Sequence, residues 1–132
     1  MPQDRELAAA GSLIPRKALL IVVCFNSHDQ LPELVAAFRD FEQGNVGNHV
    51  VVVENSSDMR VPEFIESNLK SERIHVAVAS ENQGFSHGVN HGYNIAQDLW
   101  GDFDFVVLLN PDVLSAGPVA CELVHRAEQE SE

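Results

Sequence analysis

The feature of this sequence that most restricts its fold is a series of short apolar runs separated by segments with helical spacing. Residues 19–24 and 50–53 are continuous aliphatic runs rich in β-branched side chains. Such a run is typical of a strand that is buried on both faces of a parallel sheet. Residues 74–78 and 103–109 have the same character, so we expect four strands. Parallel strands need long crossover connections, and the segments between the runs should therefore form helices.

These connecting segments have the spacing of amphipathic helices. Apolar side chains in residues 31–38 recur every three or four positions, and Pro32 suits the first turn of a helix. Further helices are expected over residues 61–69, 88–99 and 118–128. Alternating strands and helices predict right-handed crossovers and an α/β fold, a three-layer sandwich with a mainly parallel sheet.

Length and charge limit the number of domains and the classes of partner. The chain has 132 residues, which is enough for one domain. We expect residues 18–128 to form it, with a disordered segment at 1–17 and an acidic tail at 129–132. The 20 acidic and 8 basic residues give a net charge of -12, which argues against nucleic acid as a partner because its phosphates would be repelled. A nucleotide can still bind where backbone amides or a divalent cation neutralise its phosphates.

Neither the cysteines nor the apolar segments indicate secretion or membrane insertion. Cys24 and Cys121 lie far apart without the spacing of a metal site, so both are expected to be reduced core residues. Residues 1–13 lack an apolar core of signal-peptide length, and no segment is long enough to span a bilayer. We expect a cytoplasmic protein, which a protein partner or a lipid-linked substrate would bring to the membrane surface.

Polar residues follow every expected strand. They occupy positions 26–29, 54–58, 80–84 and 110–112. Because ligands of parallel α/β sheets bind beyond the carboxyl ends of the strands, these four clusters are the expected place of the functional site.

Some of these clusters belong to longer motifs. Residues 81–96 read ENQGFSHGVNHGYNIA, and residues 106–112 read VVLLNPD. They resemble the ENxGFxxGxNxG and LLNPD segments of the family 2 glycosyltransferases, in particular the rhamnosyltransferase-like members. Residues 25–27 (FNS) and 54–57 (ENSS) are similar to that family's TYN and DNAS segments, so the resemblance runs in order through residues 19–113.

The resemblance implies a GT-A fold and a glycosyltransferase of polysaccharide biosynthesis. Such enzymes transfer a sugar, with inversion, from a nucleotide sugar to a saccharide or lipid-linked acceptor, and a dTDP- or UDP-linked donor is expected here. The residues that the resemblance places at the nucleotide sugar are Phe25, Asn26, Ser27, Glu54, Asn55, Asn82, Gly84, Phe85, Gly88, Asn90 and Asn110.

Gly84 and Gly88 lie around the start of the third expected helix. They would allow a tight turn and a close backbone approach, and the N-terminus of the helix would offer free N–H groups to a diphosphate. The alternative is that both glycines serve only the turn and the packing against the strands. The neighbouring motifs favour a ligand.

Asn110, Pro111 and Asp112 stand where the family has its DxD-like element. The resemblance implies that Asp112 helps to hold a divalent cation, Mg²⁺ or Mn²⁺, which bridges the two phosphates of the donor. One carboxylate suffices as a start, because such cations take hard oxygen ligands and add phosphate oxygens. The alternative is an ordinary Asn-Pro-Asp turn after the strand. Asn110 replaces the first Asp of the element.

Glu54 stands where the family usually has an aspartate that contacts the base or the ribose. Its carboxylate would accept the same hydrogen bonds with a different reach, or it is simply an exposed acid at the end of a strand. Asn26 and Ser27 either face the base or cap the following helix. Phe25 replaces a tyrosine.

Other candidate side chains have ordinary explanations. His87 and His91 are four residues apart on one helix face, but no third zinc ligand is evident, and we interpret them as polar surface residues. The family uses a downstream carboxylate as general base on the acceptor. Glu122 and Glu128 are late carboxylates, but they fall in the last expected helix, where a solvated face explains them. The catalytic residue therefore stays unassigned.

The resemblance covers only the donor-binding half of such an enzyme, so the expected fold is a truncated one. Three interpretations stay open: a fragment of an active enzyme, a donor-binding pseudoenzyme, or a half-site that a second chain or a second copy completes. The alternative function is a non-catalytic nucleotide-binding or interaction module on the same scaffold.

Overall fold

The computed structural model describes residues 16–79, 81–111 and 119–130, which form one sheet between two layers of helices. The sheet has the strand order β3-β2-β1-β4, and every neighbouring pair is parallel. Its strands are β1 (Ala18–Cys24), β2 (Asn48–Glu54), β3 (Ile74–Val78) and β4 (Phe105–Leu109). The predicted four-stranded parallel sheet is confirmed.

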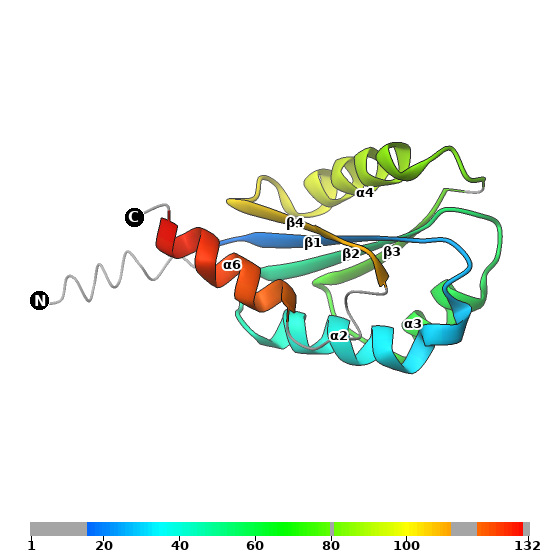
Figure 1. The fold of residues 1–132 in the computed structure, drawn as a ribbon, viewed down its shortest axis with the longest axis horizontal. Helices are drawn as coiled ribbons and strands as arrows, with labels where there is room; N and C mark the ends of the chain where they lie inside the picture. Colours follow the sequence, from blue (N-terminus) through cyan, green and yellow to red (C-terminus); the bar gives the residue numbers. More distant parts are fainter. Residues whose placement is uncertain (1–15, 80, 112–118, 131–132) are drawn as a thin grey trace, which may run out of the picture.

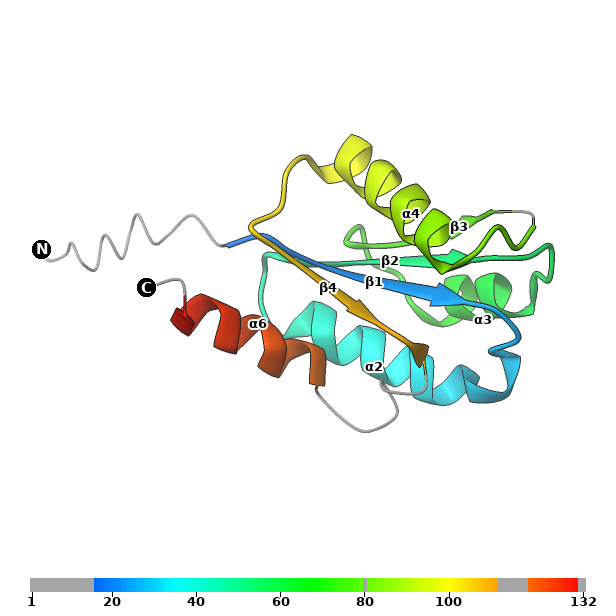
Figure 2. The ribbon, with the colours of Figure 1, turned by 45° about the horizontal axis from the view of Figure 1, so that its top comes forward.

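Helices cover both faces of this sheet. The helices are η1 (His28–Gln30), α2 (Leu31–Gln43), α3 (Arg60–Asn68), α4 (Phe85–Trp100) and α6 (Val119–Glu130). Figure 1 shows α4 alone on one face, with α2, α3 and α6 on the other, and Figure 2 shows the same layers after a turn. The three-layer α/β sandwich is therefore confirmed. None of the helices in the described ranges is long and apolar enough to cross a lipid bilayer.

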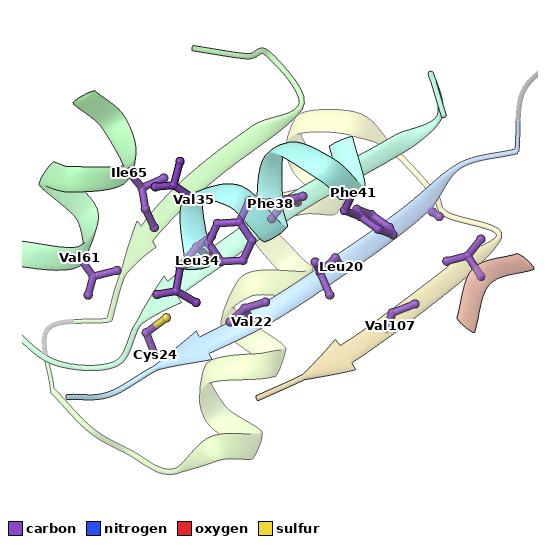
Figure 3. Packing of buried hydrophobic residues seen from close by; sticks show 14 residues of the cluster. Leu20, Val22, Cys24, Leu34, Val35, Phe38, Phe41, Val61, Ile65 and Val107 are labelled. Atoms are coloured by element: carbon purple, nitrogen blue, oxygen red, sulfur yellow. The ribbon is translucent and has the colours of Figure 1, made fainter. Parts of the chain in front are cut away.

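β1 and β2 form the centre of the core because all seven residues of each strand are buried. Alternate side chains of β1 point to opposite faces, as in any strand. Leu20 and Val22 pack against Phe38 and other side chains of α2, as Figure 3 shows. The side chains of the other face pack beneath α4. The continuous apolar runs thus reflect burial on both sides.

The two cysteines are free thiols, as predicted. Cys24 is fully buried in the core between β1 and α2, and Cys121 is half-buried on α6. Burial raises the pKa of the Cys24 thiol to about 12, with a further contribution from the nearby Glu54 carboxyl. A thiol of this kind is unreactive at neutral pH.

Three helices extend beyond one of their predicted ends. α2 continues to Gln43 because Phe41 extends its buried face beyond the expected end at position 38. α4 begins at Phe85, three residues before the expected start at Gly88. α6 ends at Glu130, so it reaches into the segment that was expected to be an acidic tail.

The chain reverses its winding between β3 and β4. From β1 through β3 it moves outward with α2 and α3 on one face, and α4 then returns over the other face to place β4 beside β1. The switch point lies between β1 and β4. In open α/β sheets the ligand crevice forms outside the carboxyl ends of the strands at this point.

Candidate functional site

The carboxyl ends of three strands are in register at one edge of the sheet. Cys24 pairs with Glu54, and Glu54 pairs with Val78. The next residues continue this alignment, since the Asn55 N–H donates to the Cys24 carbonyl at 2.8 Å and the Ala79 N–H donates to the Glu54 carbonyl at 2.8 Å. The polar clusters that follow these strands therefore start from one line of the molecule, which we call the carboxyl edge.

α4 begins at the carboxyl edge with a turn that only glycine adopts easily. Gly84 is the N-cap residue, with φ 98° and ψ 163°. The Asn82 side-chain Oδ1 accepts a hydrogen bond from the Gly84 N–H at 2.9 Å and so fixes the turn. Gly84 has open space around it, so conformation rather than crowding explains the glycine.

The first turn of α4 presents unpaired backbone donors. Within the described part of the chain, the N–H groups of Phe85, Ser86 and His87 form no hydrogen bond, and no side chain caps the helix. Free N–H groups and the helix dipole make such an end a site for an anion. The predicted helix N-terminus is thus present, although it starts at Phe85.

Gly88 has a different role from the one expected at a helix start. Its N–H donates to the Gly84 carbonyl at 3.1 Å and is therefore not available to a ligand. A Cβ atom at Gly88 would lie 2.9 Å from the Val23 Cγ1. Gly92 is similar, with Val53 Cγ2 at 2.7 Å from its Cβ position. Gly88 and Gly92 let α4 lie close to the sheet, so the packing alternative explains Gly88.

Glu54 is buried at the end of β2, with a relative exposure of 1%. The alternative of an exposed strand-end acid is therefore wrong. Its Oε2 accepts a hydrogen bond from the Ser56 hydroxyl at 2.6 Å, and the Ser56 oxygen in turn accepts from the Asp58 N–H at 3.0 Å. Burial raises the pKa of the Glu54 carboxyl, while the Ser56 hydrogen bond opposes this.

We expect Glu54→Gln to flatten the dependence of stability on pH. Because the folded-state pKa of Glu54 is raised, the folded chain holds this proton more tightly than the unfolded chain. Stability from this group is full below the ordinary carboxyl pKa and is lost as the pH rises through the raised value. Melting curves from pH 4 to pH 8 should therefore show the variant gaining stability relative to the wild type toward pH 8. Parallel profiles would contradict this, and the exposed Glu63→Gln is the control.

The residues after β1 are held in a strained turn. Asn26 has a φ of 59°, in the left-handed region, and Phe25 is 49% exposed. Ser27 is the N-cap of η1 but makes no side-chain capping bond. The helix-capping alternative is therefore wrong for Ser27.

A pocket separates the start of α4 from the end of β4. Its volume is about 550 Å³, and it is lined by Phe85, Leu108, Leu109 and Asn110. The fold thus brings together two of the predicted site residues, Phe85 and Asn110, from different motifs. Asp112, the predicted metal ligand, lies outside the described residues.

The remaining candidates lie on helix surfaces. Asn90 is exposed in the second turn of α4. The rings of His87 and His91 are stacked with their centres 6.4 Å apart, and no group of three metal-binding side chains occurs among the described residues. Glu122 is exposed on α6 and pairs with Arg126 at 3.4 Å, as its interpretation as a solvated acid requires.

Two contributors were not predicted from the sequence. Ser56 donates the hydrogen bond to Glu54, and its position two residues after the strand-end acid is the only sequence signal for it. Gly92 completes the close contact of α4 with the sheet. Its spacing of four residues from both Gly88 and the buried Ala96 was a signal for a helix face made of small residues.

Comparison with known families agrees with this arrangement. The sequence matches the family described as "Glycosyltransferase like family 2" over residues 15–132, which includes every strand and helix of the structure. A comparison with curated proteins gave no match. The matched region contains the polar residues that follow the strands and the α4 turn. The chain therefore belongs to the family 2-like glycosyltransferases, and its parallel α/β sandwich is the GT-A-like fold of a domain of that family.

Proposed function

We propose that the chain binds a nucleotide sugar, dTDP- or UDP-linked, at the carboxyl edge and serves as the donor-binding part of a glycosyltransferase. The observation that carries this proposal is the start of α4 at the carboxyl edge, where a glycine-only turn precedes three N–H groups that are unpaired among the described residues. A diphosphate is the anionic group of such a donor, and a helix N-terminus suits it.

The site residues divide by the part of the donor that each would contact. We assign the diphosphate to the first turn of α4 and to Asn82, whose exposed amide Nδ2 donates to no group among the described residues. The nucleoside would lie over Glu54 and residues 25–27. The sugar would enter the pocket between Phe85 and Asn110, next to the helix end that holds its phosphate.

A divalent cation fits this arrangement chemically. The carboxamide of Asn110 and the carboxylate of Asp112 offer hard oxygen atoms of the kind that Mg²⁺ and Mn²⁺ prefer. Asn110 lines the pocket beside the first turn of α4. When bound, such an ion would stabilise the charge on the departing diphosphate. We therefore propose Asp112 as its main protein ligand.

The reaction would be an inverting transfer to a saccharide or lipid-linked acceptor, with a rhamnosyl donor as one candidate. The general base on the acceptor hydroxyl stays unassigned.

A non-catalytic binding module is the second candidate, and one observation favours it: Glu54 replaces the family's aspartate, and its Oε2 is already engaged by Ser56. Product analysis with nucleotide sugars, acceptors and Mn²⁺ separates the two, since donor binding without transfer would support the module.

The proposed phosphate site at the start of α4 can be tested with two glycines that share a positive φ and lie at different ends of the helix. Gly84 and Gly101 stand at opposite ends of α4, with φ values of 98° and 85°. Alanine at either position should cost about 1 kcal/mol of stability, because both require a positive φ. Only Gly84→Ala should weaken binding of UDP, by roughly tenfold, because it moves the phosphate donors.

Calorimetry with UDP and with uridine measures this difference. We expect the wild-type chain to bind UDP more tightly than uridine, and Gly84→Ala to remove most of that preference. Equal UDP affinities for Gly84→Ala and Gly101→Ala would show that the start of α4 does not hold the diphosphate. An equal affinity of the wild-type chain for UDP and uridine would lead to the same conclusion.

A further inference from the structure

One asparagine connects three segments of the carboxyl edge. Asn55 follows β2 and is 2% exposed. Its backbone N–H donates to the Cys24 carbonyl at the end of β1, at 2.8 Å. Its side-chain Nδ2 donates to the Asn82 Oδ1 at 3.0 Å and to the Gly84 carbonyl at 3.2 Å. A single residue thus joins the ends of β1 and β2 to the turn before α4.

The orientation of both side-chain amides is set by backbone groups. The Gly84 carbonyl can only accept, so the Asn55 group that faces it must be the NH₂. The Gly84 N–H can only donate, so the Asn82 group that faces it must be the oxygen. Neither amide can be turned over without losing a bond to the backbone.

The connection continues into the first turn of α4. The Gly84 carbonyl that accepts from Asn55 also accepts from the Gly88 N–H, at 3.1 Å. Any movement of the Gly84 peptide would therefore shift the unpaired N–H groups that follow it. We propose that Asn55 is a positioning residue that anchors the N-terminus of α4 to β2 and so sets the place of the donor diphosphate. This inference rests on the proposed function of that helix end.

The surroundings of Asn55 distinguish positioning from a general contribution to stability. Its Oδ1 is buried and has no hydrogen-bond partner among the described residues. The penalty for an unpaired buried acceptor is similar in size to the gain from two neutral hydrogen bonds. Asn55→Ala should therefore change the melting temperature little while it frees the turn. Asn55→Asp should be worse than alanine, because it places a carboxylate oxygen opposite the Asn82 Oδ1 and the Gly84 carbonyl.

The anchor itself can be measured without any ligand. Hydrogen exchange followed by NMR reports the opening of the Gly88 N–H to Gly84 bond. In Asn55→Ala we expect the Gly88 amide to exchange roughly tenfold faster, with the Ala96 amide of the same helix unchanged. The exposed Asn94→Ala, also on α4, is the control and should leave both rates unchanged. An unchanged Gly88 rate in Asn55→Ala would overturn the anchor.

The effect on the ligand is tested by a double-mutant cycle. Asn55→Ala should weaken UDP binding by roughly tenfold, with uridine affinity unchanged. Asn82→Ala should weaken UDP binding further, because it also removes the proposed contact of the Asn82 amide with the diphosphate. The double variant should lose less than the sum of the two single losses, because both substitutions break the hydrogen bond between Asn55 and Asn82. Unchanged UDP affinity in Asn55→Ala, additive losses, or equal losses for UDP and uridine would overturn the positioning role.

The two measurements separate this inference from the proposed function. A wild-type chain that binds no UDP would contradict the proposed function. It would also contradict the role of Asn55 in binding. The exchange rates would still decide whether the anchor exists. Wild-type UDP binding combined with normal affinity in Asn55→Ala would overturn only the inference.

Discussion

Replacing Gly88 with valine is expected to lower the free energy of unfolding by about 3 kcal/mol, the largest stability effect that we predict for one substitution. The first added carbon would lie 2.9 Å from the Val23 Cγ1, which is closer than real Cβ contacts. Val23 is itself buried in β1 and has little room to move. α4 would have to shift away from the sheet, and the first turn that is proposed to bind phosphate would move with it.

The control for this prediction is the neighbouring His87→Ala, which lies on an exposed turn of α4 and should change stability by less than about 0.5 kcal/mol. Urea unfolding of the two variants gives the comparison.

A second substitution makes the test more specific, since Val23→Ala removes the atoms that the new side chain of Gly88→Val would meet. The double variant should lose less than the sum of the two single losses. Strict additivity, or a neutral Gly88→Val, would contradict the close contact.

Much of the architecture could be predicted because it is encoded locally. The aliphatic runs at 19–24 and 50–53 are continuous, and a strand buried on both faces needs that pattern. Alternation with helices then leaves few topologies, because crossovers between parallel strands are right-handed. Polar residues after each strand were expected to lie at one edge, and the register of Cys24, Glu54 and Val78 confirms this.

The details of the site depend on distances between segments that are remote in the sequence. Gly84 and Gly88 belong to the same sequence motif, yet Gly84 adopts a positive φ in open space and Gly88 packs tightly against Val23. The burial of Glu54 likewise depends on the segments packed around it. It cannot be predicted from the position of an acidic residue at the end of a strand. The hydrogen bond from Asn55 to Asn82 joins residues 27 positions apart.

The expected need for a divalent cation follows from where the basic side chains lie. Apart from Arg60, the described Lys and Arg residues lie on helices or at the edge of the sheet opposite the carboxyl edge. Lys17 before β1 and Arg73 before β3 are examples. Arg60 at the start of α3 is held by Asp58, with a nitrogen–oxygen distance of 2.6 Å. The described part of the chain therefore offers backbone N–H groups, and no unpaired Lys or Arg side chain, to a diphosphate at the start of α4. With a net charge of -12, the protein would otherwise repel that ligand.

Removing divalent cations with EDTA is accordingly expected to weaken UDP binding by roughly 100-fold, since a bridging metal ion contributes several kcal/mol to the stabilisation of phosphate charge. Uridine binding should not change, because uridine carries no phosphate. Asp112→Asn should reproduce the loss in the presence of Mn²⁺, whereas Asp98→Asn, an exposed acid on α4, should behave as the wild type. Calorimetric titrations with and without Mn²⁺ measure all of these affinities. If UDP bound equally well in EDTA, the backbone N–H groups alone would hold the diphosphate. If Asp98→Asn and Asp112→Asn had equal effects, the loss would reflect general charge rather than a metal ligand at Asp112.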